Sequence, residues 1–184
     1  MPPTIAPPGP RARPTAAARG RLRRTAALLA TVAAAGAVLA GCTPTIGVKV
    51  APHAAEPVCA EVVLALPKDL GGLPQLRTSA QATAAWGRPG AAVTLRCGVP
   101  ELGPTPDECT TVTSPDGTSV DWVLAEEPAS GTGDADADWT FTTYGRTPAV
   151  EVHVPGVVRE ERSINFLDEL GPAVARTERV RGCL

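Results

Sequence analysis

An abrupt change in charge composition at residue 41 divides this chain into two parts, and only the second is expected to fold as a domain. Residues 1–41 contain six arginines and no acidic residue, whereas residues 42–184 contain the other 11 basic residues and all 19 acidic ones, a net charge of −8. This composition excludes a disordered acidic tail, a collagen-like repeat and a coiled coil, and it provides no basic domain for nucleic acid. The two parts are therefore interpreted separately.

The first part has the layout of a secretory signal peptide. An arginine-rich stretch precedes Thr25–Ala40, sixteen uncharged residues of which half are alanine. This run is short and weakly apolar for a permanent membrane span, which needs about 20 residues. A basic stretch, a short apolar run and then small residues indicate export from the cytoplasm.

The four residues Leu39-Ala40-Gly41-Cys42 resemble the lipobox of bacterial lipoproteins. The resemblance implies cleavage before Cys42 and a diacylglyceryl thioether on its sulfur, a lipid anchor with acyl chains such as palmitate. We therefore expect residues 1–41 to be a cleaved signal peptide and residues 42–56 to be a lipidated cysteine and a flexible tether. The predicted location is the extracytoplasmic face of the cell membrane, with the lipid bilayer as one partner.

Four further cysteines lie in residues 57–184, which are expected to form a single globular domain. An even number of cysteines in an exported domain favours two disulfides, for which three pairings are possible. Cys97 and Cys109 flank a Pro- and Gly-rich segment, and Cys59 and Cys183 lie near the two ends of the domain. We predict the pairs Cys97–Cys109 and Cys59–Cys183. A zinc site is not expected, because the chain has no C-x-x-C pair and His153 is the only histidine of the domain.

The spacing of apolar residues predicts a helix near each end of the domain. Pro57–Leu66 has helical spacing and a proline suited to a first turn, although the pair Val62-Val63 leaves a strand as the alternative. Ser163 can cap a final helix with an apolar stripe, which Gly171-Pro172 would kink or split. That stripe consists of Ile164, Leu167, Leu170 and Val174.

Strands are predicted between these helices. The fragment Gly145-Arg146-Thr147 is a candidate hairpin loop, with glycine available for an unusual φ. The expected fold class is α+β, a small antiparallel β-sheet packed with an N-terminal and a C-terminal helix and braced by disulfides. The predicted strands are Ala92–Arg96, Ser119–Ala125, Trp139–Tyr144 and Pro148–Val154.

Signals for catalysis or metal binding are weak. His153 and Glu151 share the outward face of one predicted strand and could form a dyad, but no serine lies in a G-x-S-x-G setting. Asp134–Asp138 imitates the start of a calcium loop, yet Trp139 and Gly145 occupy the positions that need glycine and glutamate. We therefore assign no catalytic residue, no metal ligand and no cofactor.

Arg146 and Tyr144 are the candidate binding residues. A guanidinium at a hairpin tip beside an aromatic ring can hold a carboxylate or phosphate bidentately. Pairing with nearby acidic residues, which would serve only solubility, is the alternative. Trp86 and Trp122 are expected in the core, since a chain with six aromatic residues uses the large ones for packing.

The domain contains five short sequence blocks: Leu66-Pro67, Ala85-Trp86-Gly87, Leu95–Pro100, Val120-Asp121-Trp122 and Phe141–Val150. Together these blocks resemble DUF3515, an actinobacterial family of uncharacterised lipoproteins. The resemblance spans about Cys59 to Cys183. It implies a cellular location and a fold, but it implies no catalytic residue. Fifteen arginines against two lysines and a single asparagine are also typical of a GC-rich actinobacterium.

These observations favour a membrane-anchored, non-enzymatic module that binds a cell-envelope protein or ligand, or assists envelope assembly. One alternative is a cell-envelope hydrolase or transferase that uses His153, Glu151 and Arg146. The other is a purely structural envelope protein, which would have an exposed apolar patch and no concave site.

Overall fold

The computed structural model describes residues 44–129, 137–161 and 163–183 of the chain. The predicted signal peptide and the predicted lipidation site Cys42 lie outside the described residues. Within the described ranges, none of the helices has the length and hydropathy that a membrane crossing requires.

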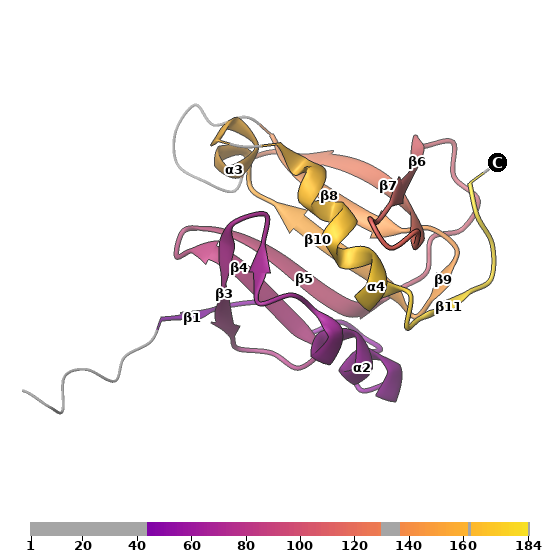
Figure 1. Cartoon of the computed structure of the whole chain (residues 1–184), viewed down its shortest axis with the longest axis horizontal. Helices are drawn as coiled ribbons and strands as arrows, with labels where there is room; N and C mark the ends of the chain where they lie inside the picture. Colours follow the sequence, from indigo (N-terminus) through magenta and orange to yellow (C-terminus); the bar gives the residue numbers. More distant parts are fainter. Residues whose placement is uncertain (1–43, 130–136, 162, 184) are drawn as a thin grey trace, which may run out of the picture. The chain divides into compact units, whose positions relative to one another are not determined.

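A single large sheet dominates the described part of the chain (Figure 1). It has nine strands in the order β1-β3-β4-β5-β10-β8-β7-β6, with β2 paired to β3, and every pairing is antiparallel except that of β1 with β3. A separate two-stranded ribbon pairs β9 with β11. The bounds are β1 Thr45–Ile46, β2 Asp69–Leu70, β3 Leu73–Thr78, β4 Thr83–Arg88, β5 Ala91–Val99, β6 Cys109–Thr113, β7 Ser119–Glu127, β8 Asp138–Thr143, β9 Arg146–Thr147, β10 Ala149–Val154 and β11 Glu178–Arg179.

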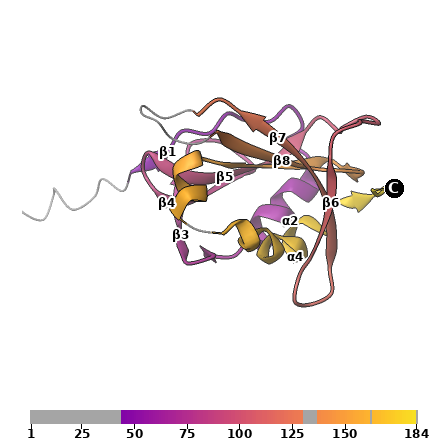
Figure 2. The same cartoon turned by 90° about the horizontal axis from the view of Figure 1, so that it is seen from above.

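The helices are short, and two of them, α2 and α4, lie on one face of the sheet (Figure 2). The fold is therefore α+β, as predicted, but the prediction of a small sheet is wrong. Strands β3, β4 and β6 lack a clear apolar alternation, so pairing with their neighbours, rather than local pattern, determines that they are strands. The helices are α2 Pro57–Ala65, α3 Gly156–Glu161, the 3₁₀ helix η2 Ile164–Leu170, and α4 Gly171–Val174.

The core lies between the helices and the sheet. Trp86 and Trp122 are 0% and 1% exposed, which confirms their predicted core positions. Along β10, the valines at 150, 152 and 154 are buried, while Glu151 and His153 alternate with them on the opposite face. This alternation is the one expected for a strand with one face against a core.

The C-terminal helical segment is split as the Gly171-Pro172 pair predicts. The Ser163 hydroxyl accepts a hydrogen bond from the Asn165 backbone N–H at the start of η2, which confirms the predicted cap. Leu167, Leu170 and Val174 are all buried against the sheet. The segment is a 3₁₀ helix up to Leu170 and an α-helix only from Gly171 onward.

Residues 44–56 are folded against the domain, so the prediction of a flexible tether is wrong for them. Ala51 and Ala54 are buried against Val99 and Ala149, and the His53 backbone N–H donates to the Gly98 carbonyl at 2.9 Å. Gly98 has φ +94°, and a Cβ there would lie 2.4 Å from the His53 carbonyl carbon. Small residues allow this close approach without any periodic apolar signal, and the compact unit begins at Pro44 rather than Pro57.

All four domain cysteines form disulfides, but the predicted pairing is wrong. The bonds are Cys59–Cys97, which joins α2 to β5, and Cys109–Cys183, which joins β6 to the C-terminal segment. Strands β10, β8 and β7 lie between β5 and β6, which separates Cys97 from Cys109 by about 19 Å at the usual strand spacing. A disulfide requires a Cα–Cα distance below about 7 Å, so proximity in the sequence was misleading.

Candidate functional site

A cavity of about 440 Å³ lies between the sheet and the 3₁₀ helix η2, and we call it the η2 cavity. Trp122 and Leu124 of β7 and Phe141 of β8 contribute its apolar lining on the sheet side. Leu167 lines it from η2, and Val112 lines it from β6. Apolar side chains from three consecutive strands and from η2, further along the chain, therefore line one cavity.

The register of three neighbouring strands brings these side chains to one face. Trp122 pairs with Thr110 of β6 and Thr143 of β8, and Leu124 pairs with Phe141. Paired residues of adjacent strands point to the same side of a sheet. At the tip of the β6–β7 hairpin, the Ser114 hydroxyl donates to the Asp168 carbonyl of η2, which ties the hairpin to the helix.

The lining of the η2 cavity carries acidic but no basic side chains. Glu108 and Asp168 both line it, and Glu108 is exposed to solvent. The chain segment that supplies β6, β7 and β8, residues 97–145, contains ten acidic residues and no lysine or arginine. A cavity with an apolar lining and an acidic surround attracts an apolar group that carries a positive charge.

The two tryptophans of the cavity differ in their hydrogen bonding. The Trp139 indole N–H donates to Glu126 Oε1 at 3.1 Å, and the Arg159 guanidinium lies 3.6 Å from the Trp139 ring centre. The Trp122 indole N–H is buried and has no acceptor within the described ranges. A buried donor without an acceptor is costly and requires an explanation, such as a bound ligand or water.

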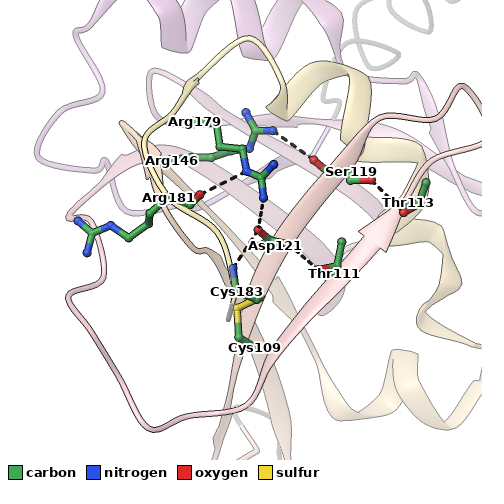
Figure 3. Close-up of polar contacts among 9 residues, drawn as sticks. All are labelled: Cys109, Thr111, Thr113, Ser119, Asp121, Arg146, Arg179, Arg181 and Cys183. Carbon is green, nitrogen blue, oxygen red and sulfur yellow. Dashed lines mark hydrogen bonds and ion pairs between the residues drawn. A yellow bond between two sulfur atoms is a disulfide. The ribbon is translucent and has the colours of Figure 1, made fainter.

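Arg146 is not an exposed loop residue, and that part of its prediction is wrong. Its side chain is 6% exposed and donates to the Thr177 carbonyl oxygen at 2.8 Å. It also donates to the Ser119 carbonyl oxygen at 3.3 Å (Figure 3). Burial, with a smaller effect of the nearby Arg179, lowers the pKa of Arg146, and Asp121 opposes both. The guanidinium therefore connects the C-terminal segment to β7.

The predicted hairpin around Arg146 is otherwise present. Strands β8 and β10 pair antiparallel, and Gly145 between them has φ +65°, the left-handed conformation that glycine permits. Tyr144 is half-buried, and its ring centre lies 5.9 Å from the Arg181 guanidinium carbon. The returning C-terminal segment, including β11, covers this loop, so Tyr144 and Arg146 do not form an open binding surface.

Asp121 holds the end of the same C-terminal segment (Figure 3). Its carboxylate is 4% exposed and accepts hydrogen bonds from the Thr111 hydroxyl at 2.6 Å, from Arg179 at 3.1 Å and from the Cys183 backbone N–H at 3.2 Å. The Cys109–Cys183 disulfide lies directly beside this carboxylate. The contacts are structural and leave Asp121 no open face for a ligand.

Glu151 and His153 share one sheet face, as predicted, but they do not form a dyad. Glu151 accepts two hydrogen bonds from Arg96, at 2.5 and 2.9 Å, and this interaction raises the pKa of Arg96. His153 Nε2 lies 3.3 Å from Asp138 Oδ2, and its Nδ1 lies 3.3 Å from the Thr140 hydroxyl. Both side chains line a polar cleft of about 230 Å³ on the face opposite the core, and Arg146 does not line it.

In the three described ranges, no cluster of three or more histidine, cysteine, aspartate or glutamate side chains could hold a metal ion. Asp134 and Asp136 of the calcium-like run lie outside those ranges. Asp138, the last residue of the run, contacts His153 and accepts a hydrogen bond from the Gly156 backbone N–H at 2.8 Å.

Sequence reasoning missed the residues of the η2 cavity. Trp122 was correctly placed in the core, but its position at the cavity wall depends on η2, which is more than forty residues further along the chain. The one available signal was the composition of the segment between Cys97 and Gly145, which contains ten acidic residues and no basic residue. That composition identifies the acidic side of the domain, although it does not reveal a cavity.

Fold and site together define a disulfide-braced α+β domain with a large antiparallel sheet and an apolar cavity beneath its β6–β7 end. The profile of the family DUF3515, described as "Protein of unknown function (DUF3515)", matches residues 24–181. The chain belongs to this family. No curated protein and no solved structure shows a significant match to it.

Proposed function

We propose that this protein is a lipid-anchored, extracytoplasmic binding module whose ligand occupies the η2 cavity. Three observations support the location: the Leu39–Cys42 lipobox pattern, the basic and apolar leader before it, and four cysteines that all form disulfides. The family match begins at residue 24 and thus includes the apolar run and Cys42. The binding role is argued from the cavity itself.

The η2 cavity is the single observation that carries the binding role. Its volume of about 440 Å³ falls in the range of small-molecule and side-chain pockets, about 300–1,000 Å³. Val112, Leu124 and Trp139, which are only partly buried, offer apolar surface, and Glu108 and Asp168 offer negative charge. The proposed ligand is therefore an apolar group with an attached cation, presented by a molecule or protein of the cell envelope.

The geometry favours this role over the two alternatives. A hydrolase built on His153, Glu151 and Arg146 would need the three side chains in one cleft, yet Glu151 is paired with Arg96 and Arg146 is buried beneath the C-terminal segment. A purely structural protein would not need a concave apolar site. In the proposed role, the protein binds its ligand and does not alter the ligand chemically.

Ligand binding is tested with a simple organic cation. We expect hexyltrimethylammonium to bind the full-length protein in phosphatidylcholine vesicles and to change the fluorescence of Trp122 and Trp139, whereas hexanoate has no effect. Glu108→Gln with Asp168→Asn should weaken cation binding by about threefold to tenfold, because each removes one partly solvated charge. Glu101→Gln is the matched control, since Glu101 is acidic and exposed but does not line the cavity. Equal affinity for hexanoate would contradict the proposed ligand class.

Anchoring is tested at Cys42. We expect Cys42→Ser to prevent lipid attachment, so that the protein accumulates as an unprocessed precursor or loses most of its association with the membrane fraction. Cell fractionation with mass analysis of the N-terminal peptide measures both outcomes. Thr43→Ser is the control and should leave processing unchanged. Full membrane retention of a processed Cys42→Ser protein would refute the anchor.

A further inference from the structure

Strand β6 forms one end of the large sheet and has an open edge. Among the residues that the structure describes, its strand pairing is with β7 alone. The three threonines of β6, at positions 110, 111 and 113, are exposed to solvent. An exposed strand at the end of a sheet is a template for pairing with another chain.

The hydrogen-bonding phase of the β6–β7 hairpin shows which backbone groups face outward. The Asp121 carbonyl accepts from the Tyr144 N–H, so it points toward β8 and away from β6. Asp121 lies opposite Thr111, which makes these two residues a non-hydrogen-bonded pair of the β6–β7 ladder. The Thr111 N–H and C=O therefore face the open edge. Alternation gives the same orientation to Thr113, in agreement with the bond from the Ser114 N–H to the Thr118 carbonyl.

The sequence of β6 leaves this edge without the usual protection. Natural edge strands are commonly blocked by a charge, a proline or a bulge, and Cys109–Thr113 reads CTTVT, without a charge or a proline. At the other end of the sheet, β1 and β2 both pair with β3. The β6 edge is thus the less protected of the two.

The open edge is continuous with the η2 cavity. Thr110 and Val112 line the cavity, while the side chain of Thr111 points to the opposite face and bonds Asp121. In a strand added beside β6, alternate side chains would point to the same face as Thr110 and Val112. Main-chain bonds would then supply affinity, and the cavity would select the side chain that enters it.

We propose that an extended, basic peptide segment of a partner protein adds a strand to the β6 edge and inserts an alternate apolar side chain into the η2 cavity. This inference rests on the proposed function, because it uses the same cavity. The basic character follows from charge complementarity: Glu108 and Asp168 line the cavity, and residues 97–145 contain ten acidic and no basic residues. The segment is presented in the extended conformation, so its cationic side chains alternate with the apolar ones and point to the opposite face of the sheet, toward solvent.

The test uses a fluorescent peptide of three Lys-Leu repeats and the full-length protein in phosphatidylcholine vesicles, with a Glu-Leu peptide as the charge control. Thr111→Pro removes an outward N–H without removing a bond of the β6–β7 ladder, and Thr111→Val is the matched control that loses only the hydroxyl. We expect Thr111→Pro to weaken binding of the Lys-Leu peptide by about tenfold relative to Thr111→Val. The Glu-Leu peptide should bind neither variant.

Peptide N-methylation tests the same edge without altering the protein, in case Thr111→Pro does not fold. Methylating alternate amides of the Lys-Leu peptide should abolish binding in one register and spare it in the other, because only one set faces β6. Equal affinity for Thr111→Pro and Thr111→Val, or equal tolerance of both methylation registers, would overturn strand addition. If hexyltrimethylammonium still binds in that case, the cavity function stands alone; if it does not, both proposals fail.

Discussion

Replacing Cys59 and Cys97 together with alanine should lower the free energy of unfolding by about 4 kcal/mol. The bond closes a loop with a sequence separation of 38 residues, and the chain-entropy model gives about this value for such a loop. Both cysteines are fully buried between α2 and β5, so the reduced protein also loses the covalent link between its helix layer and its sheet. Urea denaturation of the variant and the parent protein under non-reducing conditions, which keep the parent's disulfides intact, measures the difference.

The second disulfide joins β6 to the C-terminal segment, and its pairing can be tested together with that of the first. Cys109–Cys183 closes a separation of 74 residues, and Asp121, Arg146 and the β9–β11 pairing also hold the C-terminal segment that it joins. Mass mapping of non-reduced peptides should recover the links 59–97 and 109–183. A peptide pair linked through Cys97 and Cys109 would contradict the structure and restore the pairing expected from sequence proximity.

Arg146→Leu should lower the free energy of unfolding by about 3 kcal/mol and leave cation binding in the η2 cavity unchanged. The guanidinium satisfies the carbonyls of Thr177 and Ser119, and each buried carbonyl left without a donor costs about 1–3 kcal/mol. Arg146→Lys should recover only part of the loss, because a single ammonium cannot reproduce the planar fork of arginine. Denaturant unfolding measures stability, and hexyltrimethylammonium titration measures binding.

Arg181→Leu is the matched control for Arg146. Arg181 is also an arginine of the β9–β11 end of the domain, but it is exposed to solvent, and its guanidinium carbon lies over the Tyr144 ring, 5.9 Å from the ring centre. Its replacement should change stability by less than about 0.5 kcal/mol. A stable Arg146→Leu protein that no longer binds its ligand would instead support the original interpretation of Arg146 as a binding residue.

The elements predicted correctly are those whose signal is local. Pro57 at the first turn of α2, the alternation along β10, Gly145 in the hairpin and the Ser163 cap each act within a few residues. Such features depend on the conformational preference of the backbone and on the apolar periodicity of a short segment. Both are determined by nearby residues alone. The buried tryptophans at 86 and 122 follow from side-chain size by the same reasoning.

The elements that were missed depend on distant partners. Strand β6 has no apolar alternation and exists as the partner of β7. Residues 44–56 have no sustained apolar period, and the packing of Ala51 and Ala54 requires the close approach of the His53 backbone to Gly98 of β5. Neither segment has a pattern that separates it from a loop, because the stabilising contacts come from chain more than ten residues away.

By itself, the sequence determined the chemical character of this protein: a basic leader with a cysteine after small residues, an acidic remainder, four cysteines for two disulfides, and the residues available to a core. Only the tertiary structure decided which cysteines pair, because the insertion of three strands between β5 and β6 separates Cys97 from Cys109. It likewise buried Arg146 beneath a segment thirty-one residues later and enclosed the η2 cavity between β7 and η2. Residue type is a local property, whereas pairing, burial and concavity arise from strand order and from contacts between distant parts of the chain.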